Sequence, residues 1–183
     1  MYRVESDFEY KGYRCVTTFS DLGHRCGYVG LPEGHPLYKV DYSDKINVTF
    51  DSIEGTPIGK RSPIALFQCM DIESKDRITP ELLFDVHGGL TYSNGGKGSD
   101  YPVVSDLWWL GFDCAHAGDK PDYKKMAEYF GLNVRTKHLL EVDAMFHPYD
   151  DDVIRSVEYV QSECRSLVDQ IVGYCEKVAK YNE

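Results

Sequence analysis

The chain of 183 residues is long enough for one substantial hydrophobic core and rather short for two, so we expect a single domain spanning residues 1–183. Its formal net charge of −10 disfavours the basic surface on which non-specific nucleic-acid binding depends. No apolar run approaches the roughly 20 residues of a membrane span, and the first residues do not form a signal-peptide core. We therefore expect a cytosolic protein with neither a membrane nor a nucleic acid as its partner.

Alternation of polar and apolar residues predicts an antiparallel sheet in the first third of the chain. Residues 3–10 and 13–20 form a predicted hairpin, with Gly12 supplying the positive φ that a tight turn needs. A third strand is expected at 25–31 and a fourth at 46–50. The 14 tyrosines and 8 phenylalanines support a sheet, because aromatic side chains favour half-buried pleated surfaces.

Two further strands are predicted at 82–87 and 107–113, each followed by a turn that contains glycine. Side chains alternate along a strand, so Trp109 and Asp113 share one face of the second strand. The polar side chains of the first strand likewise share a face. If the two strands pair, these carboxylate, imidazole and indole groups lie on one side of the sheet.

The connections in the second half are marked by glycine and proline. The signal for secondary structure is weak over residues 53–79, where the apolar residues 64–67 fit either a short strand or a helical turn, and the sequence does not decide between them. Residues 94–99 are expected to form a mobile surface loop that could close over a ligand. A short helix is predicted from Pro121 or Asp122 to Phe130.

The C-terminal segment, about 152–180, is predicted to be one amphipathic helix that docks on the sheet or on a second copy of itself, which allows a homo-oligomer. The change of apolar period predicts an α+β fold, an antiparallel, aromatic-rich sheet with this helix packed across one face. Cysteine spacing contains no C-x-x-C pair, so buried reduced thiols are expected. Apolar residues recur at spacings of three and four along the helix, at Val153, Val157, Val160, Cys164, Leu167, Ile171, Cys175 and Val178.

The polar residues around the two central turns suggest a metal site. Oxygen and nitrogen donors of this kind hold Zn²⁺, Mn²⁺ or Fe²⁺ in hydrolases, where the ion acidifies a water molecule. The alternative is a hydrogen-bonded network that fixes the turns, with an aspartate orienting an imidazole and capping amides. A divalent metal ion is therefore one hypothesis for a cofactor. Its ligands would be Asp85, His87, Asp113, His116 and Asp119.

The same face also suggests a site for a small anionic ligand. Consecutive glycines let backbone N–H groups face an anion, an exposed indole could stack on a base or sugar, and an arginine could supply the counter-charge. For the indole, packing in the core is the alternative. No G-x-S-x-G, Walker A or G-x-G-x-x-G sequence is present, which excludes those fingerprints. The predicted ligand-binding residues are Arg25, His87, Gly88, Gly89, Thr91 and Trp109.

Three groups of motifs together resemble a family of small proteins encoded by bacteriophages and prophages. They are GHRCGYVG and GHPLY within 23–38, DVHGGLT at 85–91 and WWLGFDCAHAGD at 108–119. The resemblance covers roughly residues 13–119 and the closing helix. It implies an accessory gene product in the host bacterial cytoplasm, of the sort that often counters host defence by binding a defence protein or a nucleotide signal.

Two functions follow as hypotheses. The first is a phage accessory protein, with a possible anti-defence role, that binds a small anionic, nucleotide-like ligand or a host defence protein. The second is a metal-dependent hydrolase that acts on a small phosphorylated molecule, with one of the predicted metal-site residues free to serve as its base.

Overall fold

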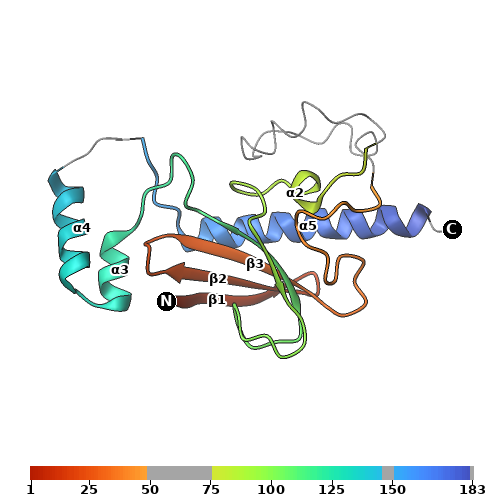
Figure 1. Cartoon of the computed structure of the whole chain (residues 1–183), viewed down its shortest axis with the longest axis horizontal. Coiled ribbons are helices and arrows are strands. Elements are labelled where there is room, and N and C mark those ends of the chain that lie inside the picture. Colours follow the sequence, from red (N-terminus) through yellow and green to blue (C-terminus); the bar gives the residue numbers. More distant parts are fainter. Residues whose placement is uncertain (49–75, 146–150, 182–183) are drawn as a thin grey trace.

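The computed structural model describes residues 1–48, 76–145 and 151–181, and its central element is a five-stranded antiparallel sheet (Figure 1). The spatial order of the strands is β1-β2-β3-β5-β4. With the long helix described below, the sheet confirms the predicted α+β fold. The strands are β1 (Tyr2–Tyr10), β2 (Tyr13–Ser20), β3 (Arg25–Leu31), β4 (Tyr92–Gly95) and β5 (Trp108–Asp113).

The first three strands confirm the predicted meander. Lys11 and Gly12 join β1 to β2 with φ values of 48° and 81°, the left-handed conformation that the hairpin prediction required. Gly23, with φ of 90°, lies in the turn between β2 and β3. At that turn the backbone N–H of Ser20 donates to the carbonyl of His24.

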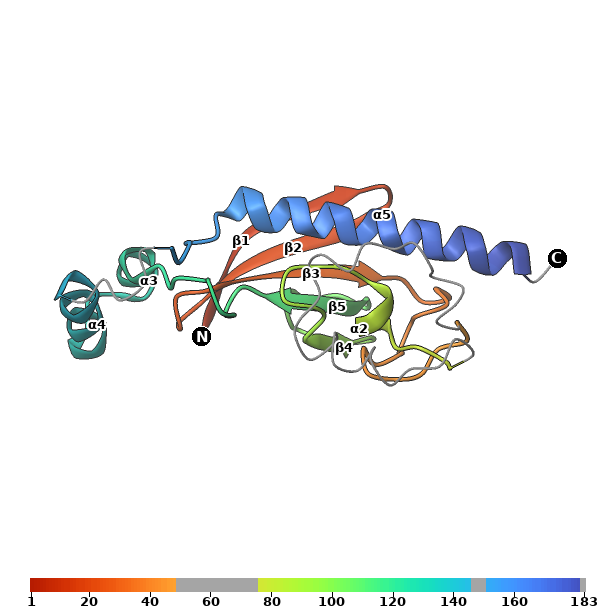
Figure 2. The same ribbon diagram turned by 90° about the horizontal axis from the view of Figure 1, so that it is seen from above.

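The helix α5 (Val157–Tyr181) packs across one face of the sheet (Figure 2). Full burial of each aliphatic side chain at this interface contributes about 1.5–3 kcal/mol. Gly27 allows the close approach, because a Cβ added there would lie 2.8 Å from the Sγ of Cys164. Docking on the sheet is thus confirmed, while self-association through α5 stays a prediction. The helix residues with no exposed surface are Val160, Cys164, Leu167, Val168 and Ile171.

The predicted start of this helix is wrong by about five residues. Val153 instead forms a parallel β-bridge with Asp119. Its N–H donates to the carbonyl of Gly118, and its own carbonyl accepts from Lys120. These long-range backbone bonds hold the segment extended, and Ser156 then begins the helix by accepting from the N–H of Tyr159 at 3.2 Å.

The predicted strand at 82–87 is also wrong. Thr79 and Pro80 begin the short helix α2 (Pro80–Leu83), where the Thr79 side chain accepts from the N–H of Leu82. After α2, the N–H and carbonyl of Asp85 bond the side chain of Gln170 on α5, at 2.7 and 2.8 Å. The backbone N–H and carbonyl of Asp85 are thus hydrogen-bonded to a side chain rather than to a neighbouring strand.

The second neighbour of β5 is β4 rather than residues 82–87. This strand occupies the beginning of the predicted loop at 94–99, so the loop is shorter than expected. Of the predicted strand at 46–50, residues 46–48 are described and are not a strand, although Ile46 donates to the carbonyl of Ile78. Residues 49 and 50, and 53–75 of the undecided segment, lie outside the described residues.

The predicted helix ending at Phe130 is confirmed as α3 (Tyr123–Phe130), capped by Asp122. A further helix, α4 (Val134–Met145), follows it, and the two project from one end of the sheet (Figure 1). Large apolar side chains are exposed in this projection, including Leu132, Val134 and Met145.

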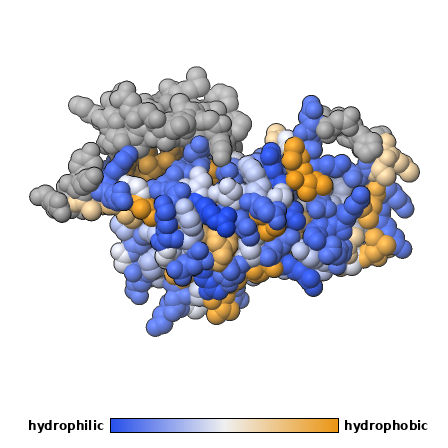
Figure 3. Space-filling model, turned by 180° about the vertical axis from the view of Figure 1, so that it is seen from behind, coloured by the Kyte–Doolittle hydropathy of each residue, from blue (hydrophilic) through white to orange (hydrophobic). Residues whose placement is uncertain are grey.

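On the face of the molecule that Figure 3 shows, the coloured hydrophobic residues form small separate groups among hydrophilic ones. Within the described ranges, no helix combines the length and the apolar character needed to span a membrane. The described cysteines form no disulfide with one another. Burial is as predicted for Cys15, Cys114 and Cys164, whereas Cys26 and Cys175 are only partly buried.

Candidate functional site

A polar cluster lies where β5 ends and α5 begins. Asp113 is the last residue of β5, and the turn that follows runs to Asp119. The β-bridge between Asp119 and Val153 brings this turn to the segment that leads into α5. The glycine turn after α2 contributes His87, whose side chain contacts Asp119 in the turn after β5 and Tyr159 on α5.

Asp119 is the centre of the cluster, and its carboxylate is almost fully buried, with 1% of the side chain exposed. Its Oδ1 accepts from Nε of Arg155 at 2.7 Å. Its Oδ2 accepts from the N–H of His116 at 3.0 Å and lies 2.7 Å from Nε2 of His87. Burial acts to raise the pKa of Asp119, but these hydrogen bonds outweigh it and lower the pKa below its ordinary value.

His87 links Asp119 to α5. Its Nδ1 lies 2.9 Å from the hydroxyl of Tyr159, and its backbone N–H donates to Oε2 of Glu163 at 3.0 Å. Because Asp119 is a carboxylate, Nε2 of His87 carries a proton and donates to it. In the neutral imidazole Nδ1 is then an acceptor, so the Tyr159 hydroxyl donates. The three side chains form a directed chain from phenol to imidazole to carboxylate.

A second imidazole, His116, lies beside the first, with 5.7 Å between the ring centroids. Its Nε2 is 3.5 Å from Oδ1 of Asp113. The ring also lies against Gly88, where an added Cβ would come within 2.0 Å of that nitrogen. Gly88 has φ of 68° and Gly89 has φ of 88°, so this turn needs glycine for its backbone as well as for its space.

Asp113 stabilises the start of the turn after β5. Its Oδ1 accepts from the N–H of Ala115 at 3.0 Å, and its Oδ2 accepts from the hydroxyl of Thr91 at 2.8 Å. Thr91 is in turn held by its own N–H, which donates to the carbonyl of Gly111. Thr91 therefore lies beside the cluster, and its hydroxyl hydrogen is directed to Asp113.

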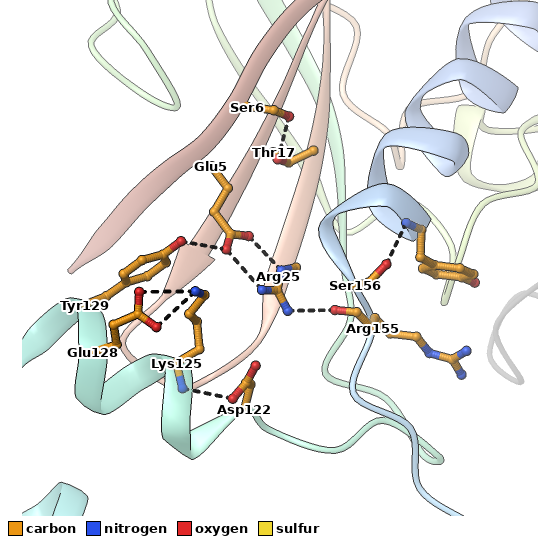
Figure 4. Close-up of polar contacts among 11 residues, drawn as sticks. Glu5, Ser6, Thr17, Arg25, Asp122, Lys125, Glu128, Tyr129, Arg155 and Ser156 are labelled. Carbon is orange, nitrogen blue, oxygen red and sulfur yellow. Dashed lines mark hydrogen bonds and ion pairs between the residues drawn. The ribbon is translucent and has the colours of Figure 1, made fainter.

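Arg155 contributes the cation of the cluster. Its guanidinium carbon lies 5.0 Å from the ring centroid of Tyr159, and its side chain is 26% exposed. The hydrogen bond with Asp119 raises the pKa of Arg155 further. In Figure 4 the guanidinium of Arg155 points away from Arg25. Only the backbone carbonyl of Arg155 meets Arg25, accepting from Nη1 at 2.8 Å.

Arg25 does not supply the predicted counter-charge for a ligand. It is 7% exposed and pairs with Glu5 through two hydrogen bonds, Nε to Oε2 at 2.6 Å and Nη2 to Oε1 at 3.0 Å (Figure 4). Tyr129 donates to the same carboxylate at 3.1 Å, and Phe19 lies beneath the guanidinium. Arg25 therefore joins β3, β1 and α3 in a buried ion pair.

Trp109 is not a stacking surface either. The predicted alternation is right, because Trp109 and Asp113 share the face opposite Leu110 and Phe112. However, Trp109 has no exposed surface, and its indole N–H donates to Oγ of Ser105 at 3.0 Å. The aromatic and aliphatic side chains that pack on it include Tyr101, Val103 and Leu107.

The five predicted metal ligands do not converge. Within residues 1–48, 76–145 and 151–181, no group of three or more His, Cys, Asp and Glu side chains is arranged to hold a metal ion. Both oxygens of Asp119 accept hydrogen bonds from protein groups, and the backbone of Asp85 is joined to Gln170. The geometry corresponds to the alternative interpretation, in which aspartates orient an imidazole and cap amides.

Sequence reasoning missed three members of the cluster, Arg155, Tyr159 and Glu163. Tyr159 and Glu163 are four residues apart and share one helix face beside the apolar stripe of α5. The presence of these two polar side chains beside the apolar stripe was the signal in the sequence that could have indicated a contact with another segment. Their partner His87 is more than 70 residues away in the chain, which the helix pattern does not reveal.

Neither a family model, nor a curated protein, nor a solved structure gives a significant match to this chain.

Proposed function

We propose that the protein is a bacteriophage accessory protein of the host bacterial cytoplasm that binds a small anionic, nucleotide-like ligand at His87, His116 and Arg155. The bacteriophage context rests on the motif resemblance, and the observation that carries the ligand-binding part of the proposal is the attachment of Arg155. Its Nε donates to Asp119 while a quarter of the side chain is exposed. A guanidinium has five N–H donors in a planar fork, so the outer edge retains donors suited to a phosphate or carboxylate.

The two imidazoles support the same proposal. His116 is about one-third exposed and His87 is 12% exposed, and their rings are 5.7 Å apart. Both ring nitrogens of His87 are bonded within the protein, and Nε2 of His116 is buried against Gly88. Nδ1 of His116 is therefore the imidazole nitrogen that can donate to a phosphate oxygen, while His87 positions the cluster. Of the six predicted ligand-binding residues, Arg25 and Trp109 leave the proposal. His87, Gly88, Gly89 and Thr91 stay in it as residues that position the cluster.

Charge limits the ligand to a small molecule. The protein has a net charge of −10, and Asp113 and Asp119 lie within the cluster. Asp119 is compensated by Arg155, so one phosphorylated group can be accommodated locally. A long polyanion would be repelled by the net negative charge of the protein.

A host defence protein is the second candidate partner. The exposed apolar side chains of the α3–α4 projection, Leu132, Val134 and Met145, favour this alternative, since large exposed aliphatic side chains often lie in protein interfaces. No comparable observation favours the metal-dependent hydrolase, because its predicted ligands do not converge.

Equilibrium dialysis with radiolabelled nucleoside mono-, di- and triphosphates tests the proposal. We expect Arg155→Gln to weaken binding about 10- to 100-fold, the effect of losing a charge-assisted hydrogen bond. The control is Arg14→Gln, which removes an arginine from the exposed pair with Asp7. If Arg155→Gln binds as tightly as the unaltered protein, or if no nucleotide binds, the proposal is wrong. Capture of a host protein by a chain that binds no nucleotide would favour the second candidate.

A further inference from the structure

The chain of Tyr159, His87 and Asp119 has the arrangement of an activated nucleophile. The Tyr159 hydroxyl is 2.9 Å from Nδ1 of His87, and Nε2 of His87 is 2.7 Å from Asp119. The tyrosine and histidine rings meet edge to face, with centroids 5.6 Å apart. A nucleophile bonded to a base, with the base oriented by a third group, is the diagnostic geometry of covalent catalysis.

The charged state of Asp119 determines which atom donates in each hydrogen bond of this chain. Its carboxylate is held by Arg155 and by the N–H of His116, so it is an acceptor toward His87. The opposite tautomer of His87 would place a nitrogen lone pair against this carboxylate. In the neutral imidazole, Nδ1 therefore faces Tyr159 as an acceptor, in position to take the phenolic proton.

The same helix holds both reacting groups. Tyr159 lies in the first turn of α5, where its N–H donates to Oγ of Ser156. Glu163, one turn further along, accepts from the N–H of His87 and is 4% exposed. The distance between phenol and imidazole is thus fixed by the helix and does not depend on the glycine turn alone.

We propose that Tyr159 is a catalytic nucleophile and that the nucleotide-like ligand is a substrate, an ester or anhydride of a nucleoside 5′-phosphate whose leaving group departs as an anion. This inference rests on the proposed function. His87 is the general base, Asp119 is a positioning residue, and Arg155, 5.0 Å from the phenol ring, stabilises the negative charge of the phosphoryl group.

The reaction has two steps. In the first, Oη of Tyr159 attacks phosphorus, the bond to the leaving oxygen breaks, and the phenolic proton passes to Nδ1 of His87, which then loses it to solvent. In the second, water attacks the nucleotidyl-tyrosine while His87 takes a proton from it. The bond from phosphorus to Oη breaks, and Tyr159 recovers its proton from His87. The sum is hydrolysis, with one water consumed.

The test uses the full chain and the p-nitrophenyl ester of thymidine 5′-monophosphate, because p-nitrophenolate leaves without a proton. We expect a burst of p-nitrophenolate equal to the protein concentration, and an acid-quenched protein heavier by one thymidylyl group, mapped to Tyr159. Tyr159→Phe should abolish both signals. His87→Gln should slow the burst at least about 100-fold, the usual contribution of a general base.

The control is Tyr129→Phe, which removes a hydroxyl bonded to Glu5 away from the cluster and should keep the full burst. Equilibrium dialysis with thymidine 5′-monophosphate, done in parallel, separates the two proposals. Binding without burst or adduct in the unaltered protein overturns the nucleophile and leaves the proposed function intact, whereas neither binding nor adduct overturns both. An adduct on any residue other than Tyr159 also overturns the inference, and peptide mapping detects it even if Tyr159→Phe fails to fold.

Discussion

Oδ1 of Asp119 accepts a hydrogen bond of 2.7 Å from Nε of Arg155, which joins the turn after β5 to the segment that leads into α5. The β-bridge between Asp119 and Val153 ties the backbones of the same two segments. The Asp119 side chain is 1% exposed and the Arg155 side chain is 26% exposed, so the pair is buried on one side and open on the other. That asymmetry makes Asp119 a structural anchor and leaves Arg155 available to a ligand.

Replacing Asp119 with Asn should destabilise the protein by about 3–5 kcal/mol, the usual result of breaking a buried charge pair. The amide removes the charge that compensates Arg155, and it cannot accept all three hydrogen bonds in the same way. Urea unfolding followed by circular dichroism measures the change. The matched control is Asp7→Asn, whose exposed pair with Arg14 should contribute at most about 1 kcal/mol. Equal losses from the two variants would contradict the anchoring role.

The contribution of Asp119 should depend on pH with a definite sign. Its pKa is lower in the folded protein than its ordinary value, so the unfolded chain binds the proton more tightly. The stabilisation is therefore complete above the unfolded pKa, roughly pH 4, and is lost as pH falls through the lower folded pKa. The difference in unfolding free energy between the unaltered protein and Asp119→Asn should shrink between about pH 5 and pH 2.5. A difference that stays constant or grows over this range would show that the carboxylate is not stabilised in its charged form.

Gly88→Ala should destabilise the protein more than Gly12→Ala. Both glycines have positive φ, 68° and 81°, so each substitution incurs about 1–2 kcal/mol of backbone strain. A Cβ at position 12 meets nothing within 4 Å, whereas at position 88 it would lie 2.0 Å from His116. We expect an additional loss of about 1–3 kcal/mol from overpacking.

A double variant separates these two effects. His116→Ala should recover the additional loss in the Gly88→Ala background, because it removes the ring that the new Cβ would meet. Thermal unfolding of the four proteins of this cycle gives the coupling energy. If the effects of the two substitutions on the unfolding free energy are simply additive, the contact between Gly88 and His116 is not the reason that residue 88 must be glycine.

The sequence predicted the elements whose signals are local. Period-two alternation located β1, β2, β3 and β5, and the spacing of apolar residues located α5, because each pattern reflects one buried face. It also placed Trp109 and Asp113 on the same face. The turn at Lys11 and Gly12 was visible because its backbone conformation requires residues of this kind.

The errors arose where distant residues decide the local structure. Residues 82–87 alternate as a strand would, but Gln170 on α5 satisfies the backbone of Asp85. Arg25 looked available to a ligand because its partner, Glu5, lies 20 residues earlier on another strand. His87 and Asp119 were both predicted as site residues, but their direct contact and the part played by Tyr159 depend on the docking of α5.

Arg25→Met tests the corrected role of this arginine. It leaves the carboxylate of Glu5, 6% exposed, without its charged partner, so we expect a loss of about 3–5 kcal/mol in unfolding free energy. Replacing both partners, as in Glu5→Leu with Arg25→Met, should recover much of this loss, because no buried charge then remains unpaired. Nucleotide affinity, measured by dialysis at a temperature where the variant is folded, should change less than twofold. A large loss of affinity in folded Arg25→Met, together with intact stability, would return Arg25 to the ligand site and remove its structural role.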